Sequence, residues 1–357
     1  MDKSDSCSNA TPSSEGVALS FSVEENVSLK KYHTFSLPVF ARYFCVIDSE
    51  QTLSDLLEAV LFKSLPHVFI GEGSNTVFLQ DFPGLVVKLE MKGLQLVFED
   101  ERYVHLKVSA GESWHHVVEY TLSRNWFGLE NLSLIPGTAG AAPIQNIGAY
   151  GVELKDVLVE LSAIDVKTGQ ALLFSKQECH FAYRDSRFKQ EPGRYVITSI
   201  SLKLSKTPEV HADYSGIKEE LEKYNLSNPS PQQLSRVICA IRRNKLPDPS
   251  VLANAGSFFK NPVVSAFEYQ SLQEKFPEIK SHKVCDKAYK IHAAWLIESC
   301  GFKGKEIHNI GVYEKQALVL TNNGKASGAQ LKEAVEEIVD AVKNKFLISL
   351  EIEPVMY

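Results

Sequence analysis

The chain has 357 residues, of which 44% are hydrophobic and 23% are charged, and its formal net charge is −6. This composition is that of a globular protein with two or three domains, since a domain holds about 150 residues. The negative charge argues against an extended nucleic-acid surface. Six cysteines without CxxC or zinc spacing predict reduced, mostly packed thiols and no metal site.

The N-terminal part of the chain gives no sign of export or membrane insertion. The first twenty residues are polar and rich in serine, lack the apolar core of a secretory signal, and predict a disordered tail over residues 1–21. The sequence contains no run of 18 apolar residues, so we expect no membrane span. These features predict a cytoplasmic enzyme or binding protein. We further expect a monomer whose partners are small molecules, with no nucleic acid and no membrane.

The N-terminal half alternates short apolar runs with two helical patterns. Apolar residues recur at helical spacing near 49–62 and 113–124, whereas other short runs favour strands. The strands are expected at 67–70, 76–79, 94–98, 103–108, 158–165, 171–174 and 195–204. These elements divide into two predicted subdomains, residues 22–88 and 89–230.

The C-terminal third predicts a further domain over residues 231–346. A proline-containing turn precedes a helix at 232–244, and a second amphipathic helix is expected at 328–346. After it, the stretch from Ile348 to Glu353 alternates strictly between apolar and polar residues. This alternation predicts a last strand within residues 347–357, with its carboxylates on the polar face.

Two glycine-rich loops are the most informative stretches of the chain. The first is Gly71-Glu72-Gly73-Ser74-Asn75, between two predicted strands, and the second runs from Asn131 to Gly151. We expect four glycines of the second loop to be free to take positive φ: Gly137, Gly140, Gly148 and Gly151. Neither the P-loop nor the dinucleotide-binding fingerprint fits the first loop, because Lys-Ser/Thr and a third glycine are missing. The two loops together predict one extended nucleotide held between them, with two ordinary surface turns as the alternative.

Three polar clusters have an ordinary structural interpretation when each is taken alone. Tyr183–Ser186 contains an arginine beside an aspartate, which is usually a surface pair. Asn254–Pro262 places a serine beside two aromatic residues in a turn. Arg242–Lys245 supplies cations at the end of a helix, where they suit the helix dipole.

Longer strings change this interpretation. They are GEGSNTVFL, GLENLSLIPGTAGAAPIQNIGAYGVELKD, FAYRDSRFK, KLPDP, NAGSFFKNPVVS, AAWLIESCGFKG and EKQALVL. From about Val27 onward, in this order and spacing, the chain closely resembles the UDP-N-acetylenolpyruvoylglucosamine reductases. The resemblance implies an α+β fold, with two FAD-binding subdomains of the vanillyl-alcohol-oxidase type and a C-terminal α+β domain for the UDP-sugar. It also implies a reaction in which NADPH reduces FAD and the flavin reduces an enolpyruvyl group in peptidoglycan precursor synthesis.

The resemblance assigns the FAD site to both glycine-rich loops. In the first loop these residues are Gly71, Gly73, Ser74 and Asn75. In the second they are Pro136, Gly137, Thr138, Gly140, Ala141, Gln145, Gly148, Ala149, Tyr150 and Gly151. Neither loop contains a histidine or cysteine for covalent attachment, so we expect the cofactor to be bound non-covalently.

Three residues match the catalytic positions of the family. Arg184 would fork onto the substrate carboxylate, Ser257 would give a proton to the α-carbon, and Glu353 would share the charge on the carboxylate. The family's Leu-Glu-Pro-Glu-Val-Arg reads Leu-Glu-Ile-Glu-Pro-Val here, so Glu353 is selected by its distance from Phe346 and Glu351 is the alternative. The diphosphate of the UDP-sugar would be bound by Tyr214, Lys245, Asn261 and Gln316.

The neighbourhood of Tyr214 resembles a subgroup that closes a tyrosine loop over the substrate. Two other functions stay open: an FAD-dependent sugar or alcohol oxidase of the same fold, and a non-catalytic nucleotide-binding relative. The lack of a residue for covalent flavin argues against the first. The presence of Arg184, Ser257 and a placed glutamate together argues against the second.

Overall fold

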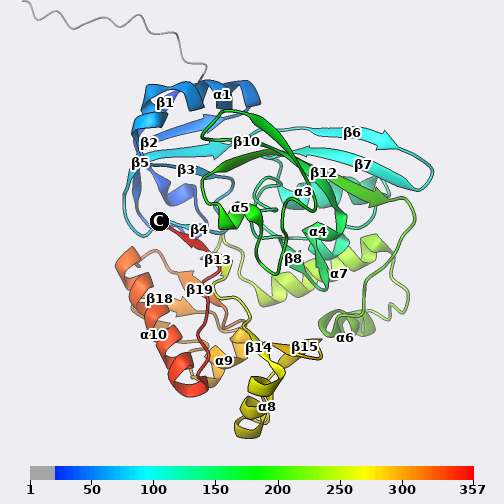
Figure 1. The fold of residues 1–357 in the computed structure, drawn as a ribbon. Helices are drawn as coiled ribbons and strands as arrows, with labels where there is room; N and C mark the ends of the chain where they lie inside the picture. The colour runs from blue at the N-terminus through cyan, green and yellow to red at the C-terminus, as the bar shows by residue number, and fades with distance from the viewer. Residues whose placement is uncertain (1–20) are drawn as a thin grey trace, which may run out of the picture.

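The computed structural model describes residues 21–357, so the predicted tail over 1–21 lies outside the described residues except for its last one. Phe21 is buried against Cys45 and Ile47, so the tail prediction is wrong at that residue. The chain then forms three α+β parts, which run from blue, through cyan and green, to yellow and red in Figure 1. Among residues 21–357, no helix combines the length and hydropathy needed to cross a bilayer.

The first part is a four-stranded sheet. Its strands, in the order β1-β2-β5-β3, are β1 (Val23–Ser28), β2 (Phe40–Ile47), β5 (Phe82–Leu89) and β3 (His67–Ile70). Strands β2, β5 and β3 are parallel, and β1 is antiparallel to β2. The helix expected over 49–62 is two helices, α1 (Glu50–Glu58) and α2 (Val60–Ser64), because Ala59 takes an extended conformation with ψ of 138°.

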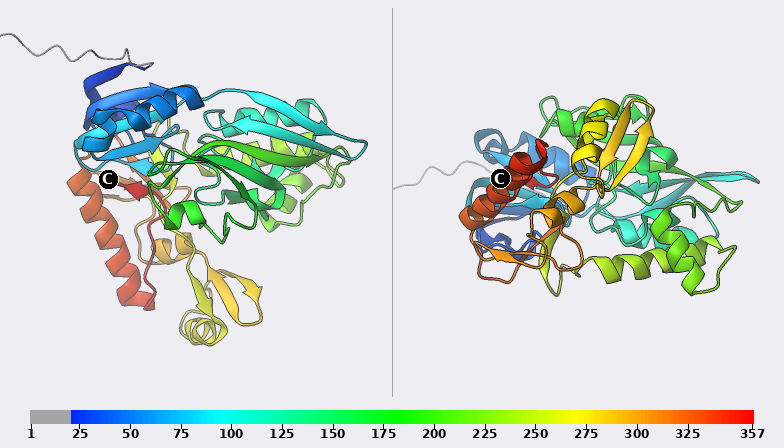
Figure 2. Two further views of the ribbon diagram at one scale, coloured as in Figure 1. Left: turned by 45° about the horizontal axis from the view of Figure 1, so that its top comes forward. Right: turned by 90° about the horizontal axis from the view of Figure 1, so that it is seen from below.

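The second part is a five-stranded antiparallel sheet. Its order is β11 (Ala171–Ser175), β10 (Leu158–Asp165), β12 (Tyr195–Ser205), β7 (Tyr103–Ser109) and β6 (Leu94–Glu99). Its smaller elements are α3 (Trp114–Ser123), the hairpin β8 (Gly148–Ala149) and β9 (Val152–Glu153), α4 (Leu154–Val157) and α5 (Arg187–Gln190). The β6–β7 hairpin extends away from the rest of the molecule (Figures 1 and 2). These strands begin and end within a residue or two of the predicted bounds, because alternation marks a half-buried strand clearly.

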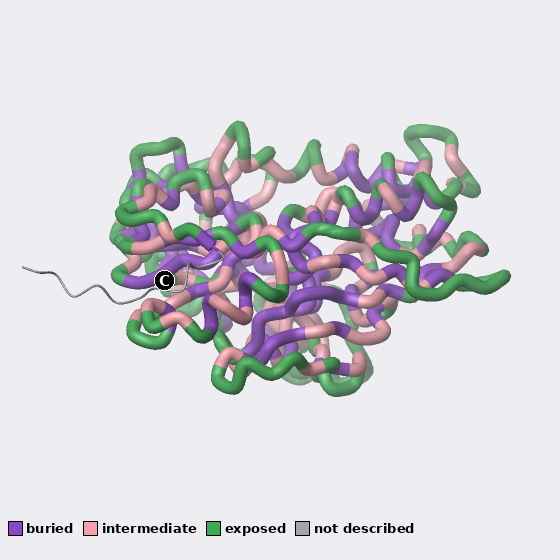
Figure 3. The backbone as a smooth tube through the Cα atoms, turned by 90° about the horizontal axis from the view of Figure 1, so that it is seen from above, coloured by how far each residue is buried: buried purple, intermediate pink, exposed green. Residues whose placement is uncertain are grey.

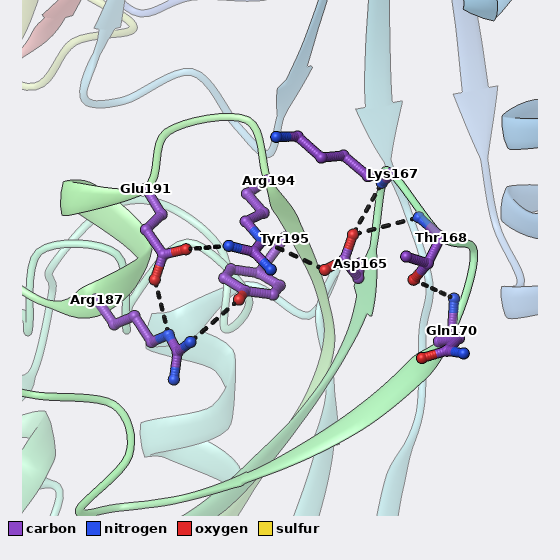
Figure 4. Close-up of polar contacts among 8 residues, drawn as sticks. All are labelled: Asp165, Lys167, Thr168, Gln170, Arg187, Glu191, Arg194 and Tyr195. Carbon is purple, nitrogen blue, oxygen red and sulfur yellow. Dashed lines mark hydrogen bonds and ion pairs between the residues drawn. The ribbon is translucent and has the colours of Figure 1, made fainter.

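A network of charged side chains lies at the start of β12 (Figure 4). The Glu191 carboxylate accepts from Arg187 Nε and from Arg194 Nη1, both at 2.8 Å. Arg194 Nε also lies 3.3 Å from Asp165 Oδ2. This network joins the residues after α5 to the turn between β10 and β11.

The third part contains two small sheets and the remaining helices. One sheet has the order β13 (Ala253–Ser257), β19 (Val319–Asn322), β18 (Ile310–Val312) and β17 (Glu306–Ile307), and the other β14 (Val263–Ser265), β16 (Ala288–Ile291) and β15 (Ser281–Cys285). The helices are α6 (Ser215–Lys223), α7 (Pro231–Lys245), α8 (Ala266–Lys275), α9 (Ala293–Ser299) and α10 (Gly328–Phe346). Helix α7 contacts the second part through hydrogen bonds from Gln232 and Arg242. The predicted boundary at residue 231 therefore precedes a helix that packs on the second part.

The first and third parts share one hydrophobic core. Phe35 and Phe44 belong to the same buried cluster as Phe258, Leu296 and Ile338. Most of the second part has a separate core, and a further cluster joins its Ile164 and Val196 to the first part. Figure 3 shows the buried residues gathered towards the middle of the molecule, with exposed residues along its outer loops. The C-terminal residues return to the first part and form β20 (Val355–Met356), parallel to β4 (Thr76–Val77) (Figure 1).

The prediction that the last strand carries Glu353 is wrong. Residues 348–353 pair with the chain only at the isolated bridge between Phe259 and Ile352 within the described structure, and β20 begins after Glu353. The segment is held by two separate main-chain bonds, Lys260 N–H to Glu351 O and Glu353 N–H to Phe258 O, each 2.9 Å. Alternation fixes which side chains turn inward, but a strand also needs a partner along its whole length.

Candidate active site

The two glycine-rich loops lie against each other. A Cβ atom on Gly71 would collide with the Thr138 side chain, and one on Gly137 would lie 2.8 Å from Ser74 Oγ. Asn75 Nδ2 donates to Gln145 Oε1 at 2.8 Å, which links the far ends of the loops. Residues about 60 positions apart in the chain thus form one continuous backbone surface, as the sequence predicts for a shared ligand.

The glycines serve two different purposes. Gly137 and Gly151 take positive φ values of 109° and 87°, as expected. Gly140 and Gly148 do not have positive φ, so that expectation is wrong for both. They are needed for space instead, since a Cβ would lie 2.5 Å from Ala110 Cβ at Gly140 and 2.8 Å from Glu153 Cγ at Gly148.

The remaining residues of the predicted FAD set frame this surface. Gly73 is buried against the backbone of Tyr32, and its carbonyl accepts the N–H of Thr34 at 3.1 Å. Pro136 and Ala141 are exposed, while Ala149 and Tyr150 lie partly buried at the β8–β9 hairpin. Tyr150 has a φ of 51°, which non-glycine residues rarely adopt.

The main-chain N–H of Gly137 already binds an anionic oxygen. It donates to the Glu72 carboxylate at 3.0 Å, which joins the first loop to the second. A main-chain N–H at a positive-φ glycine is the kind of donor that anion-binding loops present. Together with the close loop contacts, this donor fits the pyrophosphate of FAD.

Arg184 lies at the tip of a tight turn that is fixed to the second loop. Ala182 and Asp185 exchange main-chain bonds of 3.0 and 3.3 Å across the turn. Asn146 Nδ2 donates to Ala182 O at 3.1 Å, and Ser186 Oγ donates to Ile144 O at 2.7 Å. The turn is therefore bound to the glycine-rich loop at both of its ends.

The side chain of Arg184 bridges the second loop and the C-terminal segment. Its Nη2 donates to Gly148 O at 2.8 Å, and its Nε lies 3.0 Å from Glu353 Oε1. The exposed fractions of the two side chains are only 21% and 11%. Arg184 is thus not the surface residue that its neighbouring aspartate suggests.

Glu353 is a buried carboxylic acid next to a cation. Burial raises the pKa of Glu353 above its usual value, and the charges of Arg184, Lys189 and Lys260 oppose this rise without cancelling it. Glu351, the alternative, is 73% exposed and pairs with Lys260 at 2.7 Å. The two glutamates therefore occupy different environments and do not share one polar face.

Ser257 is brought next to Glu353 by the main chain. It ends β13, and the carbonyl of the following residue, Phe258, accepts the N–H of Glu353 at 2.9 Å. Asn75 of the first loop lies 3.5 Å from Glu353 O through its Nδ2. Arg184 and Glu353 are thus in contact where the glycine-rich loops and the C-terminal segment converge, and Ser257 precedes the residue, Phe258, that binds the Glu353 main chain.

Tyr214 and Lys245 form one edge of the site. The ring of Tyr214 lies edge-on to Tyr150, with centroids 5.6 Å apart, and 6.0 Å from the His282 ring. Lys245 is the exposed last residue of α7, and its Nζ lies 3.7 Å from where a Cβ on Gly216 would stand. Because Gly216 follows Tyr214 closely, the ammonium lies beside the base of the tyrosine loop.

Asn261 and Gln316 both position main chain. Asn261 Oδ1 accepts the N–H of Ala293 at 2.9 Å, at the start of α9. Gln316 Oε1 accepts the N–H of Leu318 at 3.4 Å, and Leu318 O accepts the N–H of Phe258. Gln316 therefore reaches the Ser257 region only through two intervening residues.

The sequence predicts only a helix-end role for Arg242, but the structure places it at the site. Its side chain is largely buried, its Nε donates to Leu134 O at 3.1 Å, and it lies beside the Tyr150 hydroxyl and near Arg184. Burial lowers the pKa of Arg242. The helical period of α7 is the signal that could have found it, since Arg242 lies four residues after the buried Ile238.

Lys290 was also missed. Its ammonium lies 3.6 Å from the centre of the Tyr183 ring, and burial lowers its pKa. Lys290 comes from β16 and Tyr183 from the turn that carries Arg184, so this contact joins the second and third parts at the site. A lysine in a short strand gives no sequence signal for such a contact.

Comparison with known proteins agrees with this geometry. Residues 248–357 match the family model of the C-terminal domain of UDP-N-acetylenolpyruvoylglucosamine reductase, and residues 41–175 match that of an FAD binding domain. The reductase of Chromobacterium violaceum is 44% identical over 333 residues, which cover 93% of this chain and 98% of that protein. The reductase of Pseudomonas aeruginosa is 44% identical over 339 residues, covering 95% and 100%.

The fold is shared with a solved structure. The reductase of Thermus caldophilus is 21% identical, with a TM-score of 0.66 over 94% of this chain and 99% of that one. The expected α+β fold class, with an FAD-binding region, is confirmed. With relatives 44% identical over nearly its whole length, the chain belongs to the UDP-N-acetylenolpyruvoylglucosamine reductase family.

Proposed function

We propose that Arg184, Ser257 and Glu353 carry out the NADPH-dependent reduction of UDP-N-acetylenolpyruvoylglucosamine to UDP-N-acetylmuramate, a step of peptidoglycan precursor synthesis. The two glycine-rich loops would hold FAD, whose chemistry would be hydride transfer from NADPH to the β-carbon of the enolpyruvyl group. The observation that supports this most is the buried Arg184–Glu353 pair, 3.0 Å apart, anchored to both glycine-rich loops.

The chain's own residues stabilise the charge that hydride addition creates. Negative charge develops on the α-carbon and spreads into the substrate carboxylate, so fixed cations and donors must already stand there. Arg184 is held in place through Gly148 O and Glu353, and its guanidinium can fork onto the carboxylate. Because the side chain is largely buried, solvent weakens this interaction little.

Ser257 and Glu353 take complementary roles. The Ser257 hydroxyl gives its proton to the α-carbon, which completes the addition of one hydride and one proton across the double bond. Glu353 donates a hydrogen bond to the substrate carboxylate, so it must be protonated in the complex. Burial already raises its pKa, and a second carboxylate beside it raises the pKa further.

The remaining assignments are proposals of the same kind. The glycine-rich loops bind FAD without a covalent bond, and Tyr214, Lys245, Asn261 and Gln316 surround the UDP diphosphate. Tyr214 and Lys245 lie at the edge of the site, and Asn261 lies beside Tyr183 next to Arg184. Since its substrates are nucleotides made inside cells, we place the enzyme in the cytoplasm, as a monomer.

Single-turnover kinetics of Ser257→Ala test the proposal. Flavin reduction by NADPH should stay near the wild-type rate, whereas flavin reoxidation by the UDP-enolpyruvyl sugar should slow by about 10²-fold or more, because that half-reaction needs the acid. Ser349→Ala, an exposed serine of the C-terminal segment, is the matched control. An equal loss in both half-reactions would assign Ser257 to structure.

A further inference from the structure

Lys189 binds the main chain of Arg184. From the short helix α5 its Nζ donates to Arg184 O at 3.3 Å. Arg184 has a φ of 53°, a left-handed conformation that residues with a Cβ adopt rarely and only when surrounding contacts hold it. The bonds from Asn146 and Ser186 hold the ends of the turn, so the contact from Lys189 is the one made to the strained residue's own carbonyl within the described structure.

The same ammonium faces Glu353. The groups around this carboxylate come from three elements: Tyr183 and Arg184 from the turn, Lys189 from α5, and Lys260 after β13. Of the three cations, Arg184 is paired directly with Glu353 at 3.0 Å and Lys260 with Glu351 at 2.7 Å.

The surroundings of Lys189 are mixed in charge. Burial and the charge of Lys260 lower its pKa, while Glu353, Asp185 and Glu351 raise it. Lys189 is half-buried, and it pairs within 4 Å with none of these carboxylates, among the residues that the structure describes. The Lys189 ammonium therefore donates to the Arg184 carbonyl and also interacts electrostatically with Glu353.

We infer that Lys189 is a positioning residue of this site: it holds Arg184 in its left-handed conformation and supplies a positive charge that faces Glu353 before the substrate carboxylate arrives. The inference rests on the proposed roles of Arg184 and Glu353. In the free enzyme Arg184 is aligned by its contact with Glu353 at 3.0 Å. The incoming carboxylate adds a negative charge beside Glu353, which favours the protonated form that can act as a donor.

Three substitutions separate the two parts of this role. Lys189→Met removes both the donor and the charge, Lys189→Gln keeps a donor without the charge, and Lys189→Arg keeps both. Lys167→Met, in the exposed turn between β10 and β11, is the control (Figure 4). All variants are prepared as holoenzymes, and circular dichroism checks that they fold.

The first measurement is the pKa of Glu353 without substrate. It is followed by carbon-13 NMR of labelled glutamate carboxyls, with the Glu353 signal assigned by its loss in Glu353→Gln. Removing a nearby cation disfavours the carboxylate, so Lys189→Met and Lys189→Gln should raise this pKa by about one unit. Lys189→Arg and Lys167→Met should leave it unchanged. An unchanged pKa in both neutral variants would overturn the inference.

The second measurement is the rate of flavin reoxidation by the UDP-enolpyruvyl sugar. Lys189→Met should slow it by about tenfold or more, because a small displacement of Arg184 is costly in the transition state, and Lys189→Arg should recover most of the rate. Equal slowing in Lys189→Arg and Lys189→Met would reduce Lys189 to a structural residue. If the wild type does not reoxidise with this sugar, the proposed function fails, and the pKa comparison still decides the role of Lys189.

Discussion

Two buried carboxylates of this protein pair with arginine at similar distances, yet their pKa values move in opposite directions. Glu353 lies 3.0 Å from Arg184 and its side chain is 11% exposed, while Asp165 lies 3.3 Å from Arg194 and its side chain is 6% exposed. Burial is the largest influence on both and favours the neutral acid. The pKa of Glu353 is raised, whereas that of Asp165 is lowered.

The difference comes from the hydrogen-bond donors around each carboxylate. Asp165 accepts main-chain N–H groups from Lys167 at 2.9 Å and Thr168 at 3.3 Å, in addition to Arg194 (Figure 4). Local donors of this kind stabilise the charged form and outweigh burial. Among the described residues no main-chain N–H donates to the Glu353 carboxylate, and the charges of Arg184, Lys189 and Lys260 together do not outweigh its burial. A salt bridge by itself therefore does not set the direction of the pKa shift of its carboxylate, which also depends on burial and on additional donors.

The largest effect that would sharpen this comparison is on turnover. Glu353→Gln should lower kcat by about 10²- to 10³-fold, the usual loss when one donor to a developing anion is removed, with little change in KM. Glu351→Gln changes an exposed carboxylate that pairs with Lys260, so its kcat should stay close to that of the wild type. The reverse pattern in steady-state assays would make Glu351 the catalytic glutamate.

The contributions of Asp165 and Glu353 to stability should change with pH in opposite directions. The pKa of Asp165 is lowered in the fold, so its ionised form stabilises the protein above its ordinary pKa of 3.8 and this contribution is lost as the pH falls through the folded value. Asp165→Asn should therefore lower the free energy of unfolding at pH 7 by about 1–3 kcal/mol, because N–H groups lose a charged acceptor. The loss should shrink in strongly acidic buffer.

For Glu353 the linkage runs the other way. Its folded pKa is raised above the ordinary 4.5, so its contribution is present below that value and is lost as the pH rises through the folded pKa. Glu353→Gln should accordingly equal or exceed the wild type in stability at pH 7 to 8. Denaturant titrations of both variants from pH 4 to 8 measure this, and a loss for Glu353→Gln as large as that of Asp165→Asn would refute the contrast.

The smallest expected effect is that of salt. Glu191 bridges Arg187 and Arg194, which are 29% and 43% exposed. The pKa of Glu191 is lowered overall, because the opposing effect of burial is outweighed by the two arginines. Raising ionic strength from about 0.05 to 1 M shortens the screening length to about 3 Å, so the Tm difference between Glu191→Gln and wild type should nearly vanish. The Glu353→Gln difference should change little, since that pair is shielded from solvent.

The sequence by itself determined most of the elements of this protein. Helices α7 and α10 and the strands of the second part follow from periodic burial, which each segment carries in its own side chains. The glycine-rich loops were also evident as close-approach backbone, because few residues other than glycine tolerate such contacts. The family resemblance then selected Arg184, Ser257 and Glu353, which local patterns alone rank as surface residues or a turn.

Only the tertiary structure decided how these residues differ from their neighbours. Glu351 and Glu353 look alike in an alternating stretch, and their unequal burial arises from contacts with Lys260, Arg184 and Phe258, all distant in the chain. Gly140 and Gly148 owe their crowding to Ala110 and Glu153, and Arg242 owes its burial to the second part. Each of these properties depends on what packs against a residue from elsewhere, and this information is absent from any local pattern of the sequence.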